Sequence, residues 1–130
     1  MWQFGNMKAG KGEKVTGYLK FNLIEEQLPV FLINGEAEGP TVLVLGGIHG
    51  CEYTSIDAAL ELGKKIEPKD IKGKLAVIPI ANTAAFYSRS IYVHPGDQKN
   101  LNRVFPGKSD GSAAEKLAFC LNQTAIGACD

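Results

Sequence analysis

Residues 41–52, TVLVLGGIHGCE, decide the fold class, because a short apolar run rich in β-branched residues ends there at a pair of glycines. Thr41–Leu45 predicts a strand buried on both faces, and the glycines predict a sharp turn after it. Cys51–Ile66 follows with small and apolar residues at helical spacing, and Leu75–Ile80 has the pattern of another buried strand. Strand, helix and strand in this order predict a right-handed crossover and an α/β fold, with a mixed sheet flanked by helices.

Further elements are expected on both sides of this unit. Val15–Leu23 and Leu28–Ile33 have strand patterns and predict an N-terminal β-hairpin. Ala81–Gly111 has little periodicity, and a loop of that length in a compact domain is usually functional or disordered. Ser112–Ile126 recovers helical spacing, and its first residue fits a capping box with Glu115. The chain stops soon afterwards without a final strand, so we expect one domain over residues 1–130 that is cut short.

Composition excludes several classes of protein. The 130 residues have a formal net charge of zero and are 45% hydrophobic. A neutral chain lacks the basic surplus that nucleic-acid binding usually needs, so we expect no nucleic-acid partner. No apolar run approaches the ~20 residues of a membrane span, and the first residues do not form a signal peptide, so no membrane association is expected. Three cysteines without a close pair favour a reducing cytoplasm.

His49 and Glu52 are candidate metal ligands in the turn after the first buried strand. In α/β folds, ligands bind at the carboxyl ends of the strands, and a spacing of three residues can bring an imidazole and a carboxylate to one side. These two groups are suitable ligands for Zn²⁺. The alternative is structural: His49 bonds a loop carbonyl and Glu52 caps the helix. A phosphate-binding loop is disfavoured, because the segment has neither a Gly-Lys-Ser/Thr ending nor a Gly-x-Gly-x-x-Gly pattern.

A second group of polar residues lies in the long loop. Asn102 and Arg103 are flanked by apolar anchors, and a guanidinium offers a planar pair of donors to a carboxylate. Arg89 adds a further permanent positive charge to the same loop. These residues are candidates for binding a carboxylate on a small-molecule substrate. The alternative is an ordinary loop with both arginines solvated.

Two motifs, GIHGCE at residues 47–52 and NLNRVFPG at residues 100–107, together resemble the succinylglutamate desuccinylase/aspartoacylase family, within the wider zinc carboxypeptidase-like group. The resemblance covers about residues 10–130 and implies a carboxypeptidase-like (phosphorylase/hydrolase-like) α/β fold. It implies that His49 and Glu52 are the first two zinc ligands and that Asn102 and Arg103 hold the substrate carboxylate. Arg89 stands, in a looser alignment, where the family has an arginine that stabilises negative charge on the scissile carbonyl.

The chain departs from the family pattern in two ways. Cys51 stands where the family commonly has Asp or Asn. The family's third ligand, a histidine, and its water-activating glutamate belong to segments that would follow Asp130, and His94 does not match that third ligand.

The resemblance therefore implies the N-terminal portion of a zinc-dependent hydrolase that cleaves the amide bond of an N-acyl amino acid, with the 130 residues inactive alone. A zinc carboxypeptidase acting on short peptides and a non-catalytic binding module that keeps the fold are the alternatives. The sequence leaves the oligomeric state open.

Overall fold

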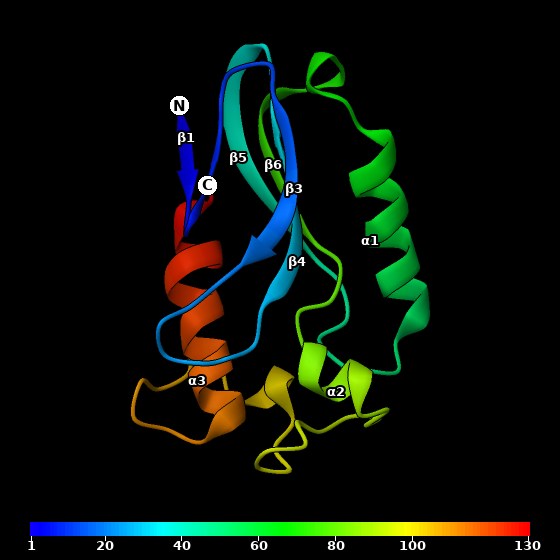
Figure 1. Cartoon of the computed structure of the whole chain (residues 1–130), viewed down its shortest axis with the longest axis vertical. Coiled ribbons are helices and arrows are strands. Elements are labelled where there is room, and N and C mark those ends of the chain that lie inside the picture. The colour runs from blue at the N-terminus through cyan, green and yellow to red at the C-terminus, as the bar shows by residue number, and fades with distance from the viewer.

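The computed structural model describes residues 1–130, and its main elements follow the chain as two hairpins, a strand–helix–strand unit and a C-terminal helix (Figure 1). The strands are β1 (Trp2–Phe4), β2 (Met7–Ala9), β3 (Lys14–Leu19), β4 (Leu28–Asn34), β5 (Ala37–Leu45) and β6 (Lys72–Ile78). The helices are α1 (Tyr53–Lys65), α2 (Thr83–Tyr87) and α3 (Ala113–Cys120). Short 3₁₀ turns cover Pro68–Asp70, Leu101–Arg103 and Ile126–Ala128, and a π turn covers Leu121–Ala125.

The main sheet has four strands in the order β3-β4-β6-β5. β3 and β4 are antiparallel, with Leu19 opposite Leu28, so the predicted N-terminal hairpin is confirmed. β5 and β6 are parallel and joined through α1, which confirms the predicted strand–helix–strand order, while β4 and β6 are antiparallel. The sheet is therefore mixed, as the sequence predicts. A separate two-stranded sheet of β1 and β2 was not expected.

The prediction that Thr41–Leu45 is buried on both faces is wrong. This run is the second half of β5, an edge strand whose residues are partly or largely exposed, with Val42 at 47%. The strands buried on both faces are β4 and β6, which have a neighbour on each side. Apolar composition predicts that a segment forms a strand. Its place in the sheet depends on pairing with residues far away in the sequence.

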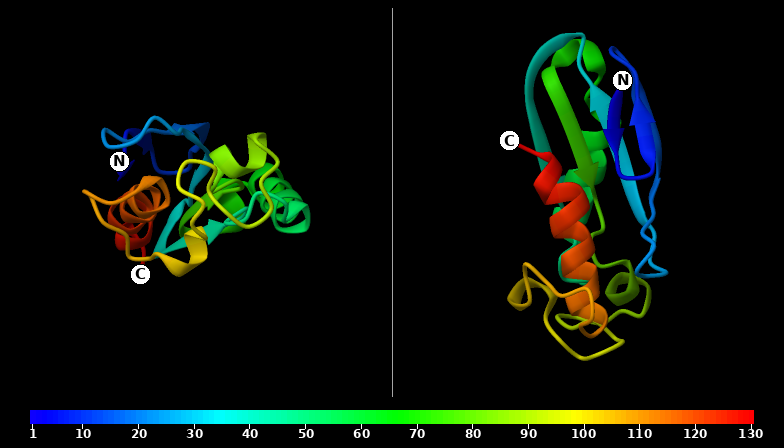
Figure 2. Two further views of the ribbon diagram at one scale, coloured as in Figure 1. Left: turned by 90° about the horizontal axis from the view of Figure 1, so that it is seen from below. Right: turned by 90° about the vertical axis from the view of Figure 1, so that its left-hand side faces the viewer.

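Helices cover both faces of the sheet. Figures 1 and 2 show α1 on one face and α3 on the other. Successive side chains of a strand point to opposite faces. Val30 and Leu32 of β4 therefore join the core cluster that contains Leu117 of α3, while Phe31 between them contacts Gly63 of α1. Because the two faces are filled by different helices, the sheet holds the loops at its lower end in Figure 1 in fixed positions.

The C-terminal helix begins where the sequence predicts. The Ser112 N–H and hydroxyl both donate to Glu115 Oε2, at 2.9 and 2.8 Å, and the capping box is complete. The regular α-helix ends at Cys120, and the rest of the predicted helix is the π turn and a 3₁₀ turn.

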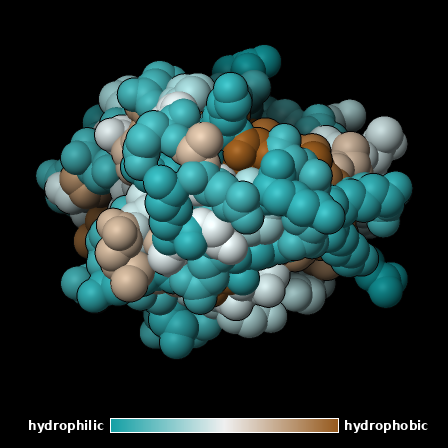
Figure 3. Space-filling view, turned by 90° about the horizontal axis from the view of Figure 1, so that it is seen from above, coloured by the Kyte–Doolittle hydropathy of each residue, from teal (hydrophilic) through white to brown (hydrophobic).

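The surface is mixed in character. The end of the molecule opposite the long loop is largely hydrophilic, with scattered apolar residues (Figure 3). None of the helices combines the length and the apolar character that crossing a membrane requires.

Candidate functional site

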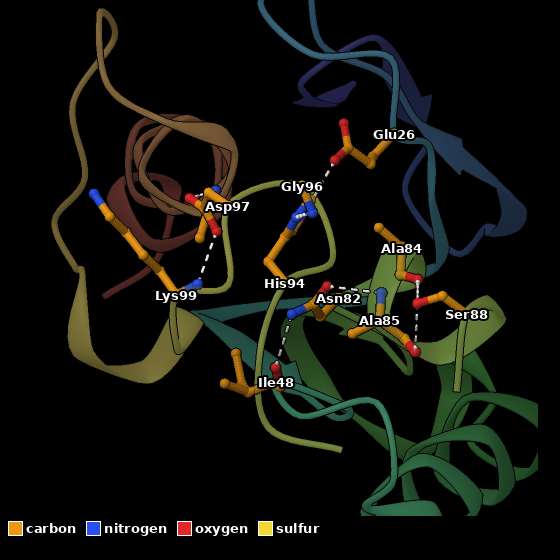
Figure 4. A network of polar contacts seen from close by, with 11 residues as sticks. Glu26, Ile48, Asn82, Ala84, Ala85, Ser88, His94, Gly96, Asp97 and Lys99 are labelled. Carbon is orange, nitrogen blue, oxygen red and sulfur yellow. Dashed lines mark hydrogen bonds and ion pairs between the residues drawn. The ribbon is translucent and has the colours of Figure 1, made fainter. Parts of the chain in front are cut away.

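The segment between β5 and α1 is a tight turn fixed to the start of α2. The Ala81 N–H donates to the Gly46 carbonyl at 2.9 Å, and the Asn82 N–H donates to the Gly47 carbonyl at 3.0 Å. Asn82 is fully buried, and its side-chain amide donates to the Ile48 carbonyl at 3.3 Å (Figure 4). Its side-chain oxygen accepts from the Ala85 N–H and caps α2. Asn82 thus connects the turn that carries His49 to the first residues of α2.

Two glycines make this turn possible. Gly47 has a φ of +61°, a conformation that residues with a Cβ rarely adopt. At Gly50, a Cβ would lie 2.5 Å from the Ala85 carbonyl carbon, so only glycine allows the turn to contact the backbone of α2. The Gly-rich sequence therefore serves close backbone packing, which brings His49 and the beginning of α1 beside α2.

His49 lies between an acidic and an amide side chain. Its Nδ1 is 2.9 Å from Glu52 Oε1, and its Nε2 is 2.9 Å from Asn100 Oδ1. Asn100 Oδ1 also accepts the Asn102 N–H at 2.9 Å, which identifies this atom as the oxygen of the amide. The imidazole and the ring of Tyr92 also pack nearly perpendicular to each other, with centroids 5.5 Å apart. The structure thus brings together two predicted site residues, His49 and Glu52, and adds Asn100.

Hydrogen bonds favour the protonated form of this histidine. The bond to Glu52 is the main cause that raises the pKa of His49; partial burial opposes it, and the bond to Asn100 adds to it. The positive charge of Arg103 acts in the opposite direction. The His49 side chain is 14% exposed and that of Glu52 46% exposed, so solvent reaches the carboxylate more readily than the ring.

The paired atoms suit a zinc ion in chemistry and spacing. His49 Nδ1 and Glu52 Oε1 are 2.9 Å apart, and two ligand atoms on a tetrahedral zinc are about 3.4 Å apart. The two atoms are therefore close enough that they would hold one ion together. Asn100 accepts from Nε2, which leaves the lone pair on Nδ1 once that nitrogen loses its proton. No group of three or more His, Cys, Asp or Glu side chains gathers anywhere in the chain, so these residues supply two ligands.

The second predicted group lies next to His49. Leu101–Arg103 forms a 3₁₀ turn capped by Asn100, and the Arg103 N–H donates to the Asn100 carbonyl at 3.0 Å. Asn102 and Arg103 are both exposed, and neither arginine of the predicted site forms an ion pair. Because Asn100 both caps this turn and contacts His49 Nε2 at 2.9 Å, the turn lies beside the histidine. The roles of Asn102 and Arg103 in binding a carboxylate stay predictions.

Arg89 lies just beyond α2, after the C-cap residue Ser88. It is exposed and has a φ of +56°, an uncommon backbone conformation for a residue with a side chain. Its N–H donates to the Phe86 carbonyl at 3.2 Å, which continues the last turn of α2. The residue is thus held on the short helix that contacts Gly50, while its role toward a substrate stays a prediction.

His94 is engaged elsewhere. Its Nε2 is 2.9 Å from Glu26 Oε1, and its Nδ1 accepts the Gly96 N–H at 3.0 Å. These partners lie outside the candidate site, and His94 does not gather with His49 and Glu52 into a group of three possible ligands, so the structure does not place it as a third ligand. Cys51 is a free, partly buried thiol.

Sequence reasoning missed two residues that hold the site together, Asn82 and Asn100. Asn100 is the first residue of the NLNRVFPG motif. Its polar side chain at the start of that motif is the sequence signal that could have identified it as a site residue. Asn82 lies in the short segment between β6 and α2, and a buried asparagine there is uncommon unless it is hydrogen-bonded. Contacts across the fold, which sequence spacing does not show, assign both residues to the site.

Comparison with known proteins places the chain in a family. Residues 38–130 match the family model described as the succinylglutamate desuccinylase/aspartoacylase catalytic domain. The N-alpha-acetyl-L-2,4-diaminobutyric acid deacetylase of Halomonas elongata is 37% identical over 109 residues, which are 78% of this chain and 31% of that protein.

Solved structures agree. An aspartoacylase family protein from Mesorhizobium loti is 34% identical and superposes with a TM-score of 0.83 over 96% of this chain. The product-bound ectoine utilization protein EutE of Ruegeria pomeroyi is 30% identical, with a TM-score of 0.82 over the same share. The chain spans 40% of the length of each of these two structures. From the match over residues 38–130 and these relatives, the chain belongs to the succinylglutamate desuccinylase/aspartoacylase family.

Proposed function

We propose that this chain forms the zinc- and carboxylate-binding part of a hydrolase that removes an acyl group from an N-acyl amino acid. The observation that carries the proposal is the contact between His49 and Glu52, with Asn100 on the other ring nitrogen and Arg103 in the adjacent turn. Relatives named as a deacetylase and as a desuccinylase support a deacylation reaction. The proposed fold relationship is to zinc carboxypeptidases, and the proposed compartment is the cytoplasm.

In this proposal, each residue has a distinct task. His49 and Glu52 hold Zn²⁺, which when bound lowers the pKa of a water ligand toward about 7. Asn100 fixes the orientation of the imidazole by accepting from Nε2. This hydrogen bond from the ring nitrogen that does not bind the metal also keeps the imidazole from rotating.

The substrate is bound and polarised by the loop residues. Arg103 and Asn102 are exposed and adjacent, so together they can donate several hydrogen bonds to a carboxylate of the substrate. Arg89 would donate to the carbonyl oxygen of the acyl group as negative charge develops on it. The proposed partner is therefore a small molecule with a free carboxylate next to the amide bond that is cleaved.

The test uses a complete catalytic domain that contains this chain. N-acetyl and N-succinyl amino acids are assayed beside short peptides, with and without a chelator. We expect hydrolysis of the acyl amino acids, loss of activity with the chelator, and loss of bound zinc and turnover in His49→Ala. Faster cleavage of the peptides would instead support a carboxypeptidase. Stoichiometric zinc in His49→Ala would contradict the ligand assignment, and absence of turnover on every substrate would support a binding module.

A further inference from the structure

The second histidine of the chain is buried and is not used by the proposed reaction. His94 is 3% exposed, and it lies in the loop that leads from α2 to Asn100. The Gly96 N–H donates to its Nδ1, so the ring proton is on Nε2 and points to the Glu26 carboxylate (Figure 4). Glu26 belongs to the loop between β3 and β4, which contributes no residue to the candidate site. The His94–Glu26 contact therefore joins two loops that are distant in sequence.

The backbone around His94 forms a closed turn. Its N–H donates to the Lys99 carbonyl at 2.8 Å, and its carbonyl accepts the Gln98 N–H at 2.9 Å. Asp97 Oδ1 accepts the Lys99 N–H, and Asp97 Oδ2 accepts the N–H of Ala114, at the start of α3. The turn is thus attached to α3 on one side and to the β3–β4 loop on the other.

Asn100 is the first residue after this turn. Its side chain holds His49 Nε2, and it caps the 3₁₀ turn that carries Asn102 and Arg103. The position of Asn100 is therefore set by residues 94–99. The His94 N–H donates to the Lys99 carbonyl, and Lys99 immediately precedes Asn100. Any movement of that turn would therefore shift Asn100 relative to His49.

We propose that His94 is a positioning residue: its hydrogen bonds to Glu26 and Gly96 fix the 94–99 turn and thereby keep Asn100 against His49. The inference rests on the proposed function, because keeping Asn100 against His49 matters only if His49 binds the metal. The same bond lowers the pKa of Glu26, so this carboxyl group stays an ionised acceptor. Nothing in the arrangement requires His94 to contact substrate or metal.

The test measures how well the hydrogen bonds around Asn100 are protected, and it does not depend on hydrolytic activity. The chain has two histidines, so ring ¹⁵N labelling gives two spin systems, and His94→Ala leaves that of His49 for assignment. Hydrogen exchange is measured at the His49 Nε2–H and at the Asn102 amide, in wild type and in Glu26→Ala. Glu25→Ala is the matched control, because Glu25 is the neighbouring exposed carboxylate and forms no hydrogen bond or ion pair with His94.

We expect Glu26→Ala to accelerate exchange at both positions by about tenfold or more, the scale of losing a hydrogen bond to a charged group. Glu25→Ala should match wild type, and Glu26→Gln should recover part of the protection, since its amide oxygen still accepts from Nε2. Rates within twofold of wild type in Glu26→Ala would overturn the proposal. So would equal acceleration in β4 and β6, or a Gln variant no better than Ala. Any of these results leaves the zinc and deacylase proposal untouched.

Discussion

Replacing Asn82 should loosen the turn that carries His49. Asn82 is fully buried, caps α2 through the Ala85 N–H and donates to the Ile48 carbonyl. In Asn82→Ala, the lost cap costs about 0.5–2 kcal/mol, and the carbonyl left without its donor costs about 1–3 kcal/mol. Because the Ile48 carbonyl is only partly buried, we expect the lower part of the second range and a total of about 2–3 kcal/mol.

Urea denaturation followed by circular dichroism measures this loss. Asn82→Asp keeps an acceptor for the Ala85 N–H, but it places a buried carboxylate without a proton to donate against the Ile48 carbonyl. We therefore expect Asn82→Asp to lose at least as much stability as Asn82→Ala at neutral pH. Asn22→Ala, at an exposed asparagine without a side-chain hydrogen bond, is the control. A loss below about 0.5 kcal/mol in Asn82→Ala, the scale of an ordinary surface substitution, would refute the reasoning.

Two further predictions concern packing and acid stability. Gly50→Ala should destabilise the fold by about 1–3 kcal/mol in the same denaturation assay, because its Cβ would lie 2.5 Å from the Ala85 carbonyl carbon. Gly127→Ala is the control and should cost less, because the atom nearest to its Cβ would be 3.1 Å away. Hydrogen bonds from the Ser112 backbone lower the pKa of Glu115 to about 2, so its contribution is present above about pH 4.5 and is lost as the pH falls toward 2. Glu115→Gln should therefore flatten the acid side of the stability curve, while Glu38→Gln at an exposed position should leave it unchanged.

Local patterns predicted most of the fold because they depend on neighbours in sequence. The crossover from β5 through α1 to β6 follows from two apolar runs around a helical one. The β1–β2 hairpin also has a local signal in the sequence, a Gly5-Asn6 turn between short alternating segments. Burial of Thr41–Leu45 was the incorrect part, because the place of a strand in a sheet is decided by pairing across the chain.

The contacts of the candidate site also divide into those between sequence neighbours, which could be predicted, and those between distant residues, which could not. Contact between His49 and Glu52 follows from their spacing of three residues within the turn that precedes α1, where the Glu52 N–H donates to the His49 carbonyl at 3.3 Å. Asn100 is 51 residues from His49, and Glu26 is 68 residues from His94, so neither contact could be read from spacing. Such contacts arise only when the long loop folds back over the end of the sheet.

Zinc titration of the ring-labelled chain tests the central claim most directly. We predict that added Zn²⁺ shifts the Nδ1 signal of His49, leaves both signals of His94 in place, and has a weaker effect in Glu52→Ala than in the control Glu61→Ala. Movement of the His94 signals, or a His49 response that is the same in Glu52→Ala and Glu61→Ala, would contradict the assignment of His49 and Glu52 as a pair of zinc ligands.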